Sequence, residues 1–265
     1  MLKRILSPEI LNGLRRIKKK LEGLRNFIFP TQEYNKLKEE AKWRSKFYSQ
    51  IISKGDLCFD VGANYGNRIA PLLFLKAKVV AIEPQEKCYS YLMENYGKKI
   101  KIETKGLSDK EGFKDFYLSN ETTISSFSKD WIDSVKDERF KGFVWNEIGQ
   151  VEMTTLDKLI EKYGKPQFIK IDVEGFELEV LKGLSQPVKV ISYEYTTPEQ
   201  TTKAVDCLNQ IYSVQKDIKC NYSIGESMEF ALKDWITYDQ MITLINTENF
   251  VKTGFGDIYI KNASL

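Results

Sequence analysis

The stretch Phe59-Asp60-Val61-Gly62-Ala63-Asn64-Tyr65-Gly66 decides the fold of this chain. It begins in a short apolar run and leads into apolar residues of helical spacing over 69–75, which predicts a turn from a strand into a helix. Glycine at position 62 lets the backbone turn tightly and approach a ligand closely. A second buried strand ends in Glu83, 21 positions after Gly62, where an acidic side chain can accept both ribose hydroxyls of an adenosine cofactor.

Strands and helices alternate outward from this stretch, which predicts an α/β Rossmann-like fold with a central, mostly parallel sheet and helices on both faces. The expected strands are residues 57–61, 78–83, 100–107, 167–173, 189–195, 222–224 with 230–232, and 256–261. An aromatic-rich insertion over 113–153 precedes the fourth strand, and we expect it to form a hairpin of 113–118 against 150–154. We divide the chain into an N-terminal helical extension, 1–52, and a cofactor-binding domain, 53–265.

Two adenosine cofactors compete for the glycine turn. A dinucleotide site needs G-x-G-x-x-G, but Asn64 and Asn67 occupy the second and third glycine positions. Asp60 would repel a diphosphate, whereas it suits the positive ammonium and sulfonium groups of S-adenosylmethionine. The alternative is that Asp60, Glu83 and the pair Ser108-Asp109 are plain turn residues. We expect S-adenosylmethionine to be bound by Asp60, Gly62, Ala63, Asn64, Gly66, Asn67, Glu83, Pro84, Ser108, Asp109 and Asp172.

Charged residues end the fourth strand, which reads Lys170-Ile171-Asp172-Val173-Glu174-Gly175. Charges that close a buried strand need partners or a function, and ligands bind at the carboxyl edge of a parallel sheet. Glu194 has the equivalent place on the fifth strand. We expect Glu174, then Asp172 and Glu194, to act as general base, and Lys170 to be either catalytic or part of an internal salt-bridge cluster. A magnesium ion held by the acids is the alternative, and both remain open.

Composition excludes several other kinds of chemistry. The chain has no histidine, which removes Ser-His and Cys-His nucleophile pairs, and its four cysteines are widely spaced. No dedicated metal site is therefore predicted, and zinc least of all. No apolar run approaches the roughly 20 residues that span a bilayer, and the first residues lack the apolar core of a secretory signal. The cytoplasm is the expected compartment.

The net charge of +3 is unevenly distributed. Residues 1–30 carry +6 and the rest of the chain carries −3, so nucleic acid is not an expected partner of the body of the protein. Residues 8–25 place leucine and isoleucine on one helical stripe beside the basic run. Such a helix suits docking on its own domain or on a second subunit, or peripheral contact with the anionic inner face of a membrane.

Several blocks of the sequence resemble the FkbM family of methyltransferases. They are F-D-V-G-A-N-Y-G at 59–66, A-I-E-P at 81–84, L-S-D-K-E-G at 107–112, Ser125-Ser126, T-L-D at 155–157 and F-I-K-I-D-V-E-G-F-E-L-E-V-L-K-G at 168–183. The resemblance covers about residues 50–200. It implies a class I methyltransferase fold, S-adenosylmethionine as donor, and O-methylation of a glycan or other hydroxyl-bearing acceptor, often a sugar in a polysaccharide, glycolipid or natural product. We expect acceptor specificity in the insertion and the N-terminal region.

Two other functions stay open. One is RNA 2′-O-methylation with the basic N-terminal arm on phosphates, against which the acidic body counts. The other is a Rossmann-like domain that binds a nucleotide or a partner protein without catalysis, against which Asp60, Gly62 and Glu83 argue together. Methylation of base amines is disfavoured, because Asp172-Val173-Glu174-Gly175 stands where such enzymes have an N/D-P-P-Y/F motif.

Overall fold

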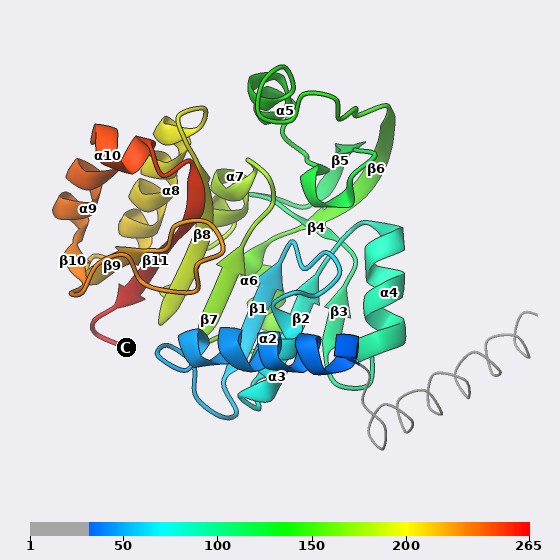
Figure 1. Cartoon of the computed structure of the whole chain (residues 1–265), viewed down its shortest axis with the longest axis horizontal. Coiled ribbons are helices and arrows are strands. Elements are labelled where there is room, and N and C mark those ends of the chain that lie inside the picture. Colours follow the sequence, from blue (N-terminus) through cyan, green and yellow to red (C-terminus); the bar gives the residue numbers. More distant parts are fainter. Residues whose placement is uncertain (1–31) are drawn as a thin grey trace, which may run out of the picture. The chain divides into compact units, whose positions relative to one another are not determined.

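The computed structural model describes residues 32–265 of the chain (Figure 1). The chain divides into two units, Met1–Arg44 and Ser45–Leu265, and helix α2 (Gln32–Tyr48) crosses that boundary. The helix expected over residues 8–25 lies outside the described residues. In the described part of the chain, no helix has both the length and the apolar character that a membrane span requires.

The second unit is built from alternating strands and helices. In chain order they are β1 (Leu57–Val61), α3 (Ile69–Phe74), β2 (Lys78–Ile82), α4 (Glu86–Tyr96), β3 (Lys101–Glu103), β4 (Gly106–Leu107), β5 (Gly112–Leu118), α5 (Lys129–Val135), β6 (Glu147–Thr154), α6 (Leu156–Tyr163), β7 (Phe168–Ile171), α7 (Glu177–Lys182), β8 (Val190–Thr196), α8 (Thr201–Val214), β9 (Ile218–Tyr222), β10 (Ile236–Thr237), α9 (Tyr238–Ile245), α10 (Glu248–Val251) and β11 (Phe255–Asn262).

The central sheet of the described residues has eight strands in the order β10-β9-β11-β8-β7-β1-β2-β3. Strands β3, β2, β1, β7 and β8 run parallel, and β11 lies antiparallel between β8 and β9. The chain proceeds outward from β1 through β2 to β3, and later from β7 to β8 on the other side. This reversal makes the carboxyl ends of β1 and β7 the place where such sheets bind ligands. The predicted Rossmann-like fold is confirmed.

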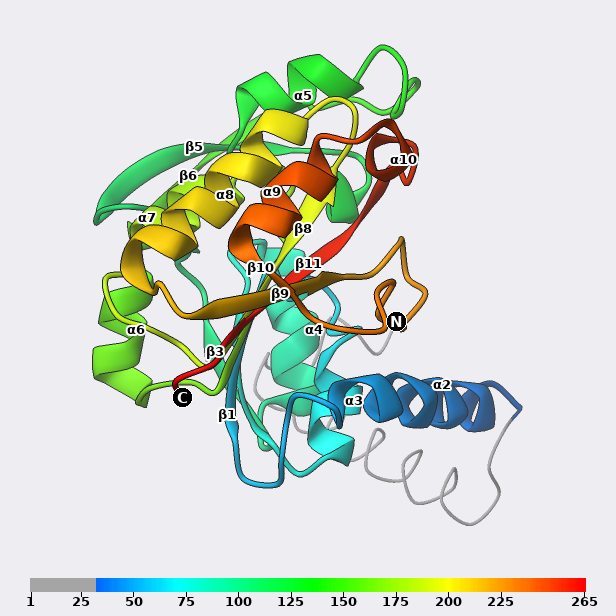
Figure 2. The same ribbon diagram turned by 90° about the vertical axis from the view of Figure 1, so that its left-hand side faces the viewer.

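Alternating side chains of the strands fill two cores, one on each face of the sheet. On β1, Phe59 and Val61 belong to the core that α6, α7, α8 and α9 cover. Cys58 belongs to the other core, which α3 and α4 cover. Figure 2 shows these two sets of helices on opposite sides of the sheet. Burial on both faces explains why the parallel strands are almost continuously apolar in sequence.

The two strands of the insertion join β4 in a small second sheet, in the order β4-β6-β5. The predicted hairpin is confirmed, because β5 pairs antiparallel with β6 and Phe113 lies opposite Glu152. The strand predicted over 100–107 is instead divided: β3 joins the central sheet, whereas β4 pairs with β6. In Figure 1 the insertion, with α5, lies beyond the carboxyl ends of β1 and β7. The insertion is therefore positioned to form one wall of a site at these strand ends.

The strand pair predicted at 222–224 and 230–232 is wrong. Strand β9 ends at Tyr222, and its partner on that side is β10. The side chain of Asn221 accepts from the backbone N–H of Leu232 (3.1 Å) and donates to its carbonyl (2.9 Å). A backbone hydrogen bond from the Ala231 N–H to the Tyr222 carbonyl (2.7 Å) brings the two segments together, but the Asn221 side chain, and not a strand backbone, makes the bonds to Leu232.

Candidate functional site

A cavity of about 220 Å³ opens at the carboxyl ends of β1, β2, β7 and β8. Its walls include most of the residues expected at the cofactor site and all four expected at the catalytic site. These are Asp60, Gly62, Ala63, Asn64, Asn67, Glu83, Pro84, Lys170, Asp172, Glu174 and Glu194. The structure thus brings together residues from four separate strand ends.

Three expected cofactor residues do not line this cavity: Gly66, Ser108 and Asp109. Gly66 faces the side chains of Leu92 and Ile69. Ser108 is fully buried and donates a hydrogen bond to the exposed Asp109 (2.8 Å). The residues just before them, at 106–107, line the cavity instead, because this segment belongs to β4 and not to the central sheet.

The glycine turn is packed directly against the end of β7. Gly62 has a φ of +79°, a conformation that favours glycine. A β-carbon at this position would overlap the carbonyl oxygen of Asp172. The Asp172 N–H also donates to the carbonyl of Val61 (3.0 Å). This close approach holds the cofactor turn and the acidic segment after β7 beside one another.

Asp60 is a buried acid with an unused acceptor. Its residue is 2% exposed, and its Oδ2 has no hydrogen-bond partner among the described residues. Burial raises the pKa of Asp60 to about 6, against the lowering effect of the charges of Lys170 and Arg68. A buried carboxylate without a partner is costly unless a cation or donor compensates it. The ammonium group of S-adenosylmethionine fits this requirement.

Glu83 is held in a fixed orientation by the backbone. One carboxylate oxygen accepts from the Asn64 N–H and the other from the Gln85 N–H, both at 2.8 Å. Burial raises the pKa of Glu83 to about 7, and these two hydrogen bonds oppose the shift. A carboxylate oxygen has two acceptor positions, so each keeps one for a ribose hydroxyl. Glu83 therefore also fits an adenosine cofactor.

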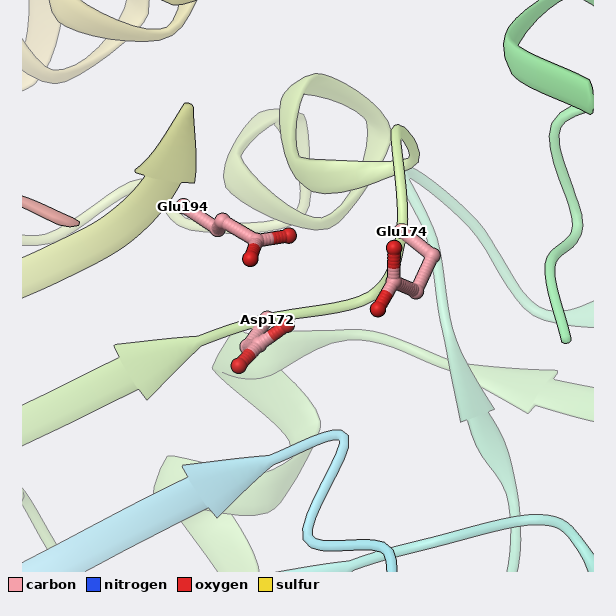
Figure 3. Close-up of side chains that lie close together, drawn as sticks. All are labelled: Asp172, Glu174 and Glu194. Atoms are coloured by element: carbon pink, nitrogen blue, oxygen red, sulfur yellow. The ribbon is translucent and has the colours of Figure 1, made fainter. Parts of the chain in front are cut away.

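Three carboxylates, of Asp172, Glu174 and Glu194, form an acidic cluster in the same cavity. One oxygen of each lies within 4.8 Å of the others, and Figure 3 shows the three side chains directed toward a common space. Within residues 32–265, no hydrogen bond or ion pair engages the Glu174 or Glu194 carboxylate. Burial, followed by repulsion from neighbouring acids, raises the pKa of both glutamates. The cluster can hold a proton, or a cation such as Mg²⁺.

The segment that carries Glu174 is fixed from several sides. Glu174 has a φ of +53°, and its carbonyl accepts from Ser126 Oγ in the insertion (2.7 Å). The Glu177 carboxylate accepts from the backbone N–H groups of Val173 and Gly175, both at 3.1 Å. These contacts define where the Glu174 side chain enters the cavity.

Lys170 lies in an internal salt-bridge cluster. The residue is 2% exposed, and its Nζ lies 2.6 Å from Asp172 and 3.6 Å from Asp257. Tyr259 donates to the other oxygen of Asp257 (3.2 Å). The two acids raise the pKa of Lys170 in spite of its burial, so it stays charged. Of the two roles expected for Lys170, its surroundings favour the structural one.

Four further lining residues belong to the insertion, where acceptor specificity was expected: Phe116, Thr122, Thr123 and Phe127. Four others were not expected from the sequence: Arg68, Gln85, Phe176 and Glu226. Arg68 immediately follows the expected Asn67, so extension of the motif by one residue would have found it. Nothing in the spacing indicated Glu226, which lies 158 positions from its partner Arg68.

Comparison with known proteins gives a family and distant relatives. Residues 60–243 match the model of the methyltransferase FkbM domain. Hexuronic acid methyltransferase AglP of Haloferax volcanii is 30% identical over 142 residues, which are 52% of this chain and 54% of the relative; the chain thus spans about half the length of that relative. Methyltransferase sdnD of Sordaria araneosa is 30% identical over 187 residues, 54% of this chain and 71% of the relative. A precorrin-6y C5,15-methyltransferase structure from Geobacter metallireducens has 11% identity and a TM-score of 0.42, with 82% and 87% of the two chains covered.

Proposed function

The chain belongs to the FkbM methyltransferase family, and on that basis we propose that it transfers the methyl group of S-adenosylmethionine to a hydroxyl oxygen of a sugar. The observation that carries the proposal is that two groups of acids line one cavity. Asp60 and Glu83 lie on the side of the glycine turn, and the acidic cluster lies at the ends of β7 and β8. The first group suits a cationic adenosine donor, and the second suits an acceptor that must lose a proton.

On the donor side, Asp60 would bind the ammonium group and Glu83 the ribose hydroxyls. Gly62 and Asn64 would form the turn over which the donor lies. Leu107 and Phe127, which also line the cavity, would contact its adenine ring. The other expected cofactor residues that line the cavity would surround the donor. They are Ala63, Asn67, Pro84 and Asp172. Ser108 and Asp109 would not contact the donor. They would only help to position the backbone of residues 106–107, which line the cavity.

On the acceptor side, we propose that a glutamate of the acidic cluster removes the hydroxyl proton. The acceptor oxygen forms a bond to the methyl carbon, the carbon–sulfur bond breaks, and its electron pair stays with sulfur. The hydroxyl proton passes to Glu174, or to Glu194, and Asp172 maintains the local negative charge. A well-placed base contributes about 10²–10⁴ in rate, and fixed alignment of the two reactants contributes at least as much. Raised pKa values suit both glutamates to this task.

A sugar as acceptor is supported by two observations. One similar protein is named a hexuronic acid methyltransferase. In addition, Phe116 of the insertion and Phe176 after β7 line the cavity, and aromatic faces suit the apolar face of a sugar ring. RNA is the weaker candidate, because the described cavity wall carries six acids and two basic residues, and phosphates would be repelled.

The test is methylation of candidate sugars and glycans by the purified full chain. A mass gain of about 14 units on oxygen, dependent on S-adenosylmethionine, is the expected product. Glu174→Gln and Glu194→Gln should slow methyl transfer and leave donor affinity unchanged. Glu179→Gln is the matched control, because Glu179 lies on α7 and pairs with Lys182. Absence of donor binding, or a methyl group on nitrogen, would overturn the proposal.

The metal alternative has its own readout. If a general base operates, chelation with EDTA leaves the rate unchanged. If the three acids instead hold Mg²⁺, EDTA abolishes methyl transfer and added Mg²⁺ restores it. The same assay therefore decides between the two ways of activating the hydroxyl.

For residues 8–25 we infer a docking role in a cytoplasmic protein, either on a second subunit or peripherally on an anionic membrane. The stripe of apolar residues beside a basic run supports this. Sedimentation of the full chain with anionic vesicles, and its mass in solution, distinguish the two. A protein that is monomeric in solution and does not sediment with anionic vesicles would contradict both roles.

A further inference from the structure

Arg68 is a buried cation on the wall of the donor cavity, just before α3. The residue is 8% exposed. Its Nη1 and Nη2 donate to the two carboxylate oxygens of Glu226 at 2.7 and 2.5 Å. A guanidinium group has five N–H donors, and the other three of Arg68 have no partner among residues 32–265. Because Arg68 lines the cavity, these donors can serve a ligand with acceptor oxygens.

We propose that Arg68 binds the carboxylate of the methionine end of S-adenosylmethionine, while Asp60 binds its ammonium group. This inference rests on the donor half of the proposed function and is independent of the acceptor. The amino-acid end of the donor carries one negative and one positive group on the same carbon. Its recognition therefore requires a cationic and an anionic side chain close together on one wall.

Asp60 and Arg68 meet this requirement. Both line the same cavity, and the charge of Arg68 lowers the pKa of Asp60, which places the two within electrostatic range. The charged or titratable groups that act on Arg68 in turn are Tyr48, Glu226 and Asp257. Glu226 uses one edge of the guanidinium group. The planar fork leaves the other donors in a fixed arrangement, which suits a second carboxylate.

Lys170, the other cation on the described cavity wall, is a poorer candidate. It lies between Asp172 and Asp257 and is more deeply buried than Arg68. Two carboxylates already surround its ammonium group, and binding a third would require it to leave the cluster. Arg68 needs no such movement.

The rival explanation is that Arg68 only fastens the segment that carries Glu226. The two explanations predict different effects of an Arg68 substitution on the affinity for a ligand that lacks the carboxylate. We therefore choose three probes: S-adenosylmethionine, its decarboxylated form, which keeps the sulfonium and ammonium groups, and 5′-methylthioadenosine, which lacks the amino-acid end. Calorimetry gives the affinity of each for the full chain.

For the unchanged protein, we expect S-adenosylmethionine to bind about tenfold or more tightly than its decarboxylated form. In Arg68→Met this ratio should fall close to 1, with the affinity for 5′-methylthioadenosine unchanged. Arg139→Met is the matched control, because Arg139 makes the same kind of forked ion pair with Glu199 away from the cavity wall. Its ratio should equal that of the unchanged protein.

The inference is overturned if the unchanged protein does not discriminate between the first two probes, or if Arg68→Met weakens all three equally. Should Arg68→Met fail to fold, Arg68→Lys serves, since it keeps the charge and loses the fork; a ratio unchanged in that variant would also count against the inference. If none of the probes binds to the unchanged protein, the donor half of the proposed function fails as well.

Discussion

The α-carbon of Gly62 is packed against the backbone carbonyl of Asp172, with no room for a β-carbon between them. This contact joins the turn after β1 to the acidic segment after β7. Because both flank the cavity, the distance between the donor side and the acidic cluster is set by backbone packing. A side chain at position 62 would disturb both sides at once.

We predict that Gly62→Ala abolishes measurable donor binding. The substitution forces the backbone apart at Asp172, and an alanine at a φ of +79° adds strain of about 1 kcal/mol or more. Calorimetry with S-adenosylmethionine measures the first effect and chemical denaturation the second. Gly149→Ala is the control, because a β-carbon there would meet no atom within 4 Å. Normal donor affinity in Gly62→Ala would show that the tight contact is unnecessary.

A second prediction concerns Asp60→Asn, which should bind the donor about 10- to 100-fold more weakly. Because Asp60 is assigned to the ammonium group, S-adenosylhomocysteine should lose affinity by the same factor, and 5′-methylthioadenosine should lose none. A larger loss for S-adenosylmethionine than for S-adenosylhomocysteine would instead assign Asp60 to the sulfonium. Donor affinity of the unchanged protein should also decline as the pH falls through about 6, where Asp60 gains a proton.

The same substitution should stabilise the ligand-free protein. The pKa of Asp60 in the folded protein is about 6, above its ordinary value of 3.8. Its contribution to stability is therefore fully present below about pH 4 and is lost as the pH rises to 6. Asp60→Asn removes this loss, so its free energy of unfolding at pH 7 should exceed that of the unchanged protein by about 1–3 kcal/mol. At pH 4 the difference should vanish, as denaturation at the two pH values would measure.

The sequence predicted the strands that build the site better than it predicted the segments beyond them. Asp60, Glu83 and Asp172 were found because each ends a buried strand, and a parallel sheet brings such ends together. Ser108 was expected at the cavity on the same logic. The logic does not hold there, because β4 leaves the central sheet to pair with β6. Glu226 belongs to an irregular segment with no periodic signal, so only the tertiary structure reveals its contact with Arg68.

The rate of methyl transfer should rise with pH as the proposed base loses its proton. Since the pKa of both Glu174 and Glu194 is raised, the inflection should lie well above pH 4.5. Glu174→Gln removes one of the negative neighbours of Glu194, so it should shift the inflection due to Glu194 to lower pH. The pH profile of kcat at saturating donor provides the measurement. An inflection that Glu174→Gln leaves in place would contradict electrostatic coupling between the two glutamates.

Ser126 should position Glu174 without touching either reactant. Its hydroxyl donates to the Glu174 carbonyl (2.7 Å) and accepts from the Ser128 N–H (2.8 Å), and the residue is fully buried. Ser126→Ala leaves both backbone groups without this partner, so we expect a loss of about 1–3 kcal/mol in stability. We also expect kcat to fall about tenfold at unchanged donor affinity, because the Glu174 backbone is no longer fixed.

The control for Ser126→Ala is Ser213→Ala. The Ser213 hydroxyl makes the same kind of bond, to the Gln210 carbonyl at 2.7 Å, but on the exposed surface of α8. Water replaces that bond, so stability should change by less than about 0.5 kcal/mol and kcat should not change. If Ser126→Ala lost stability but kept its full kcat, Ser126 would hold the insertion in place without positioning the base. A fall in kcat with the pH inflection unchanged is the result that a positioning role requires.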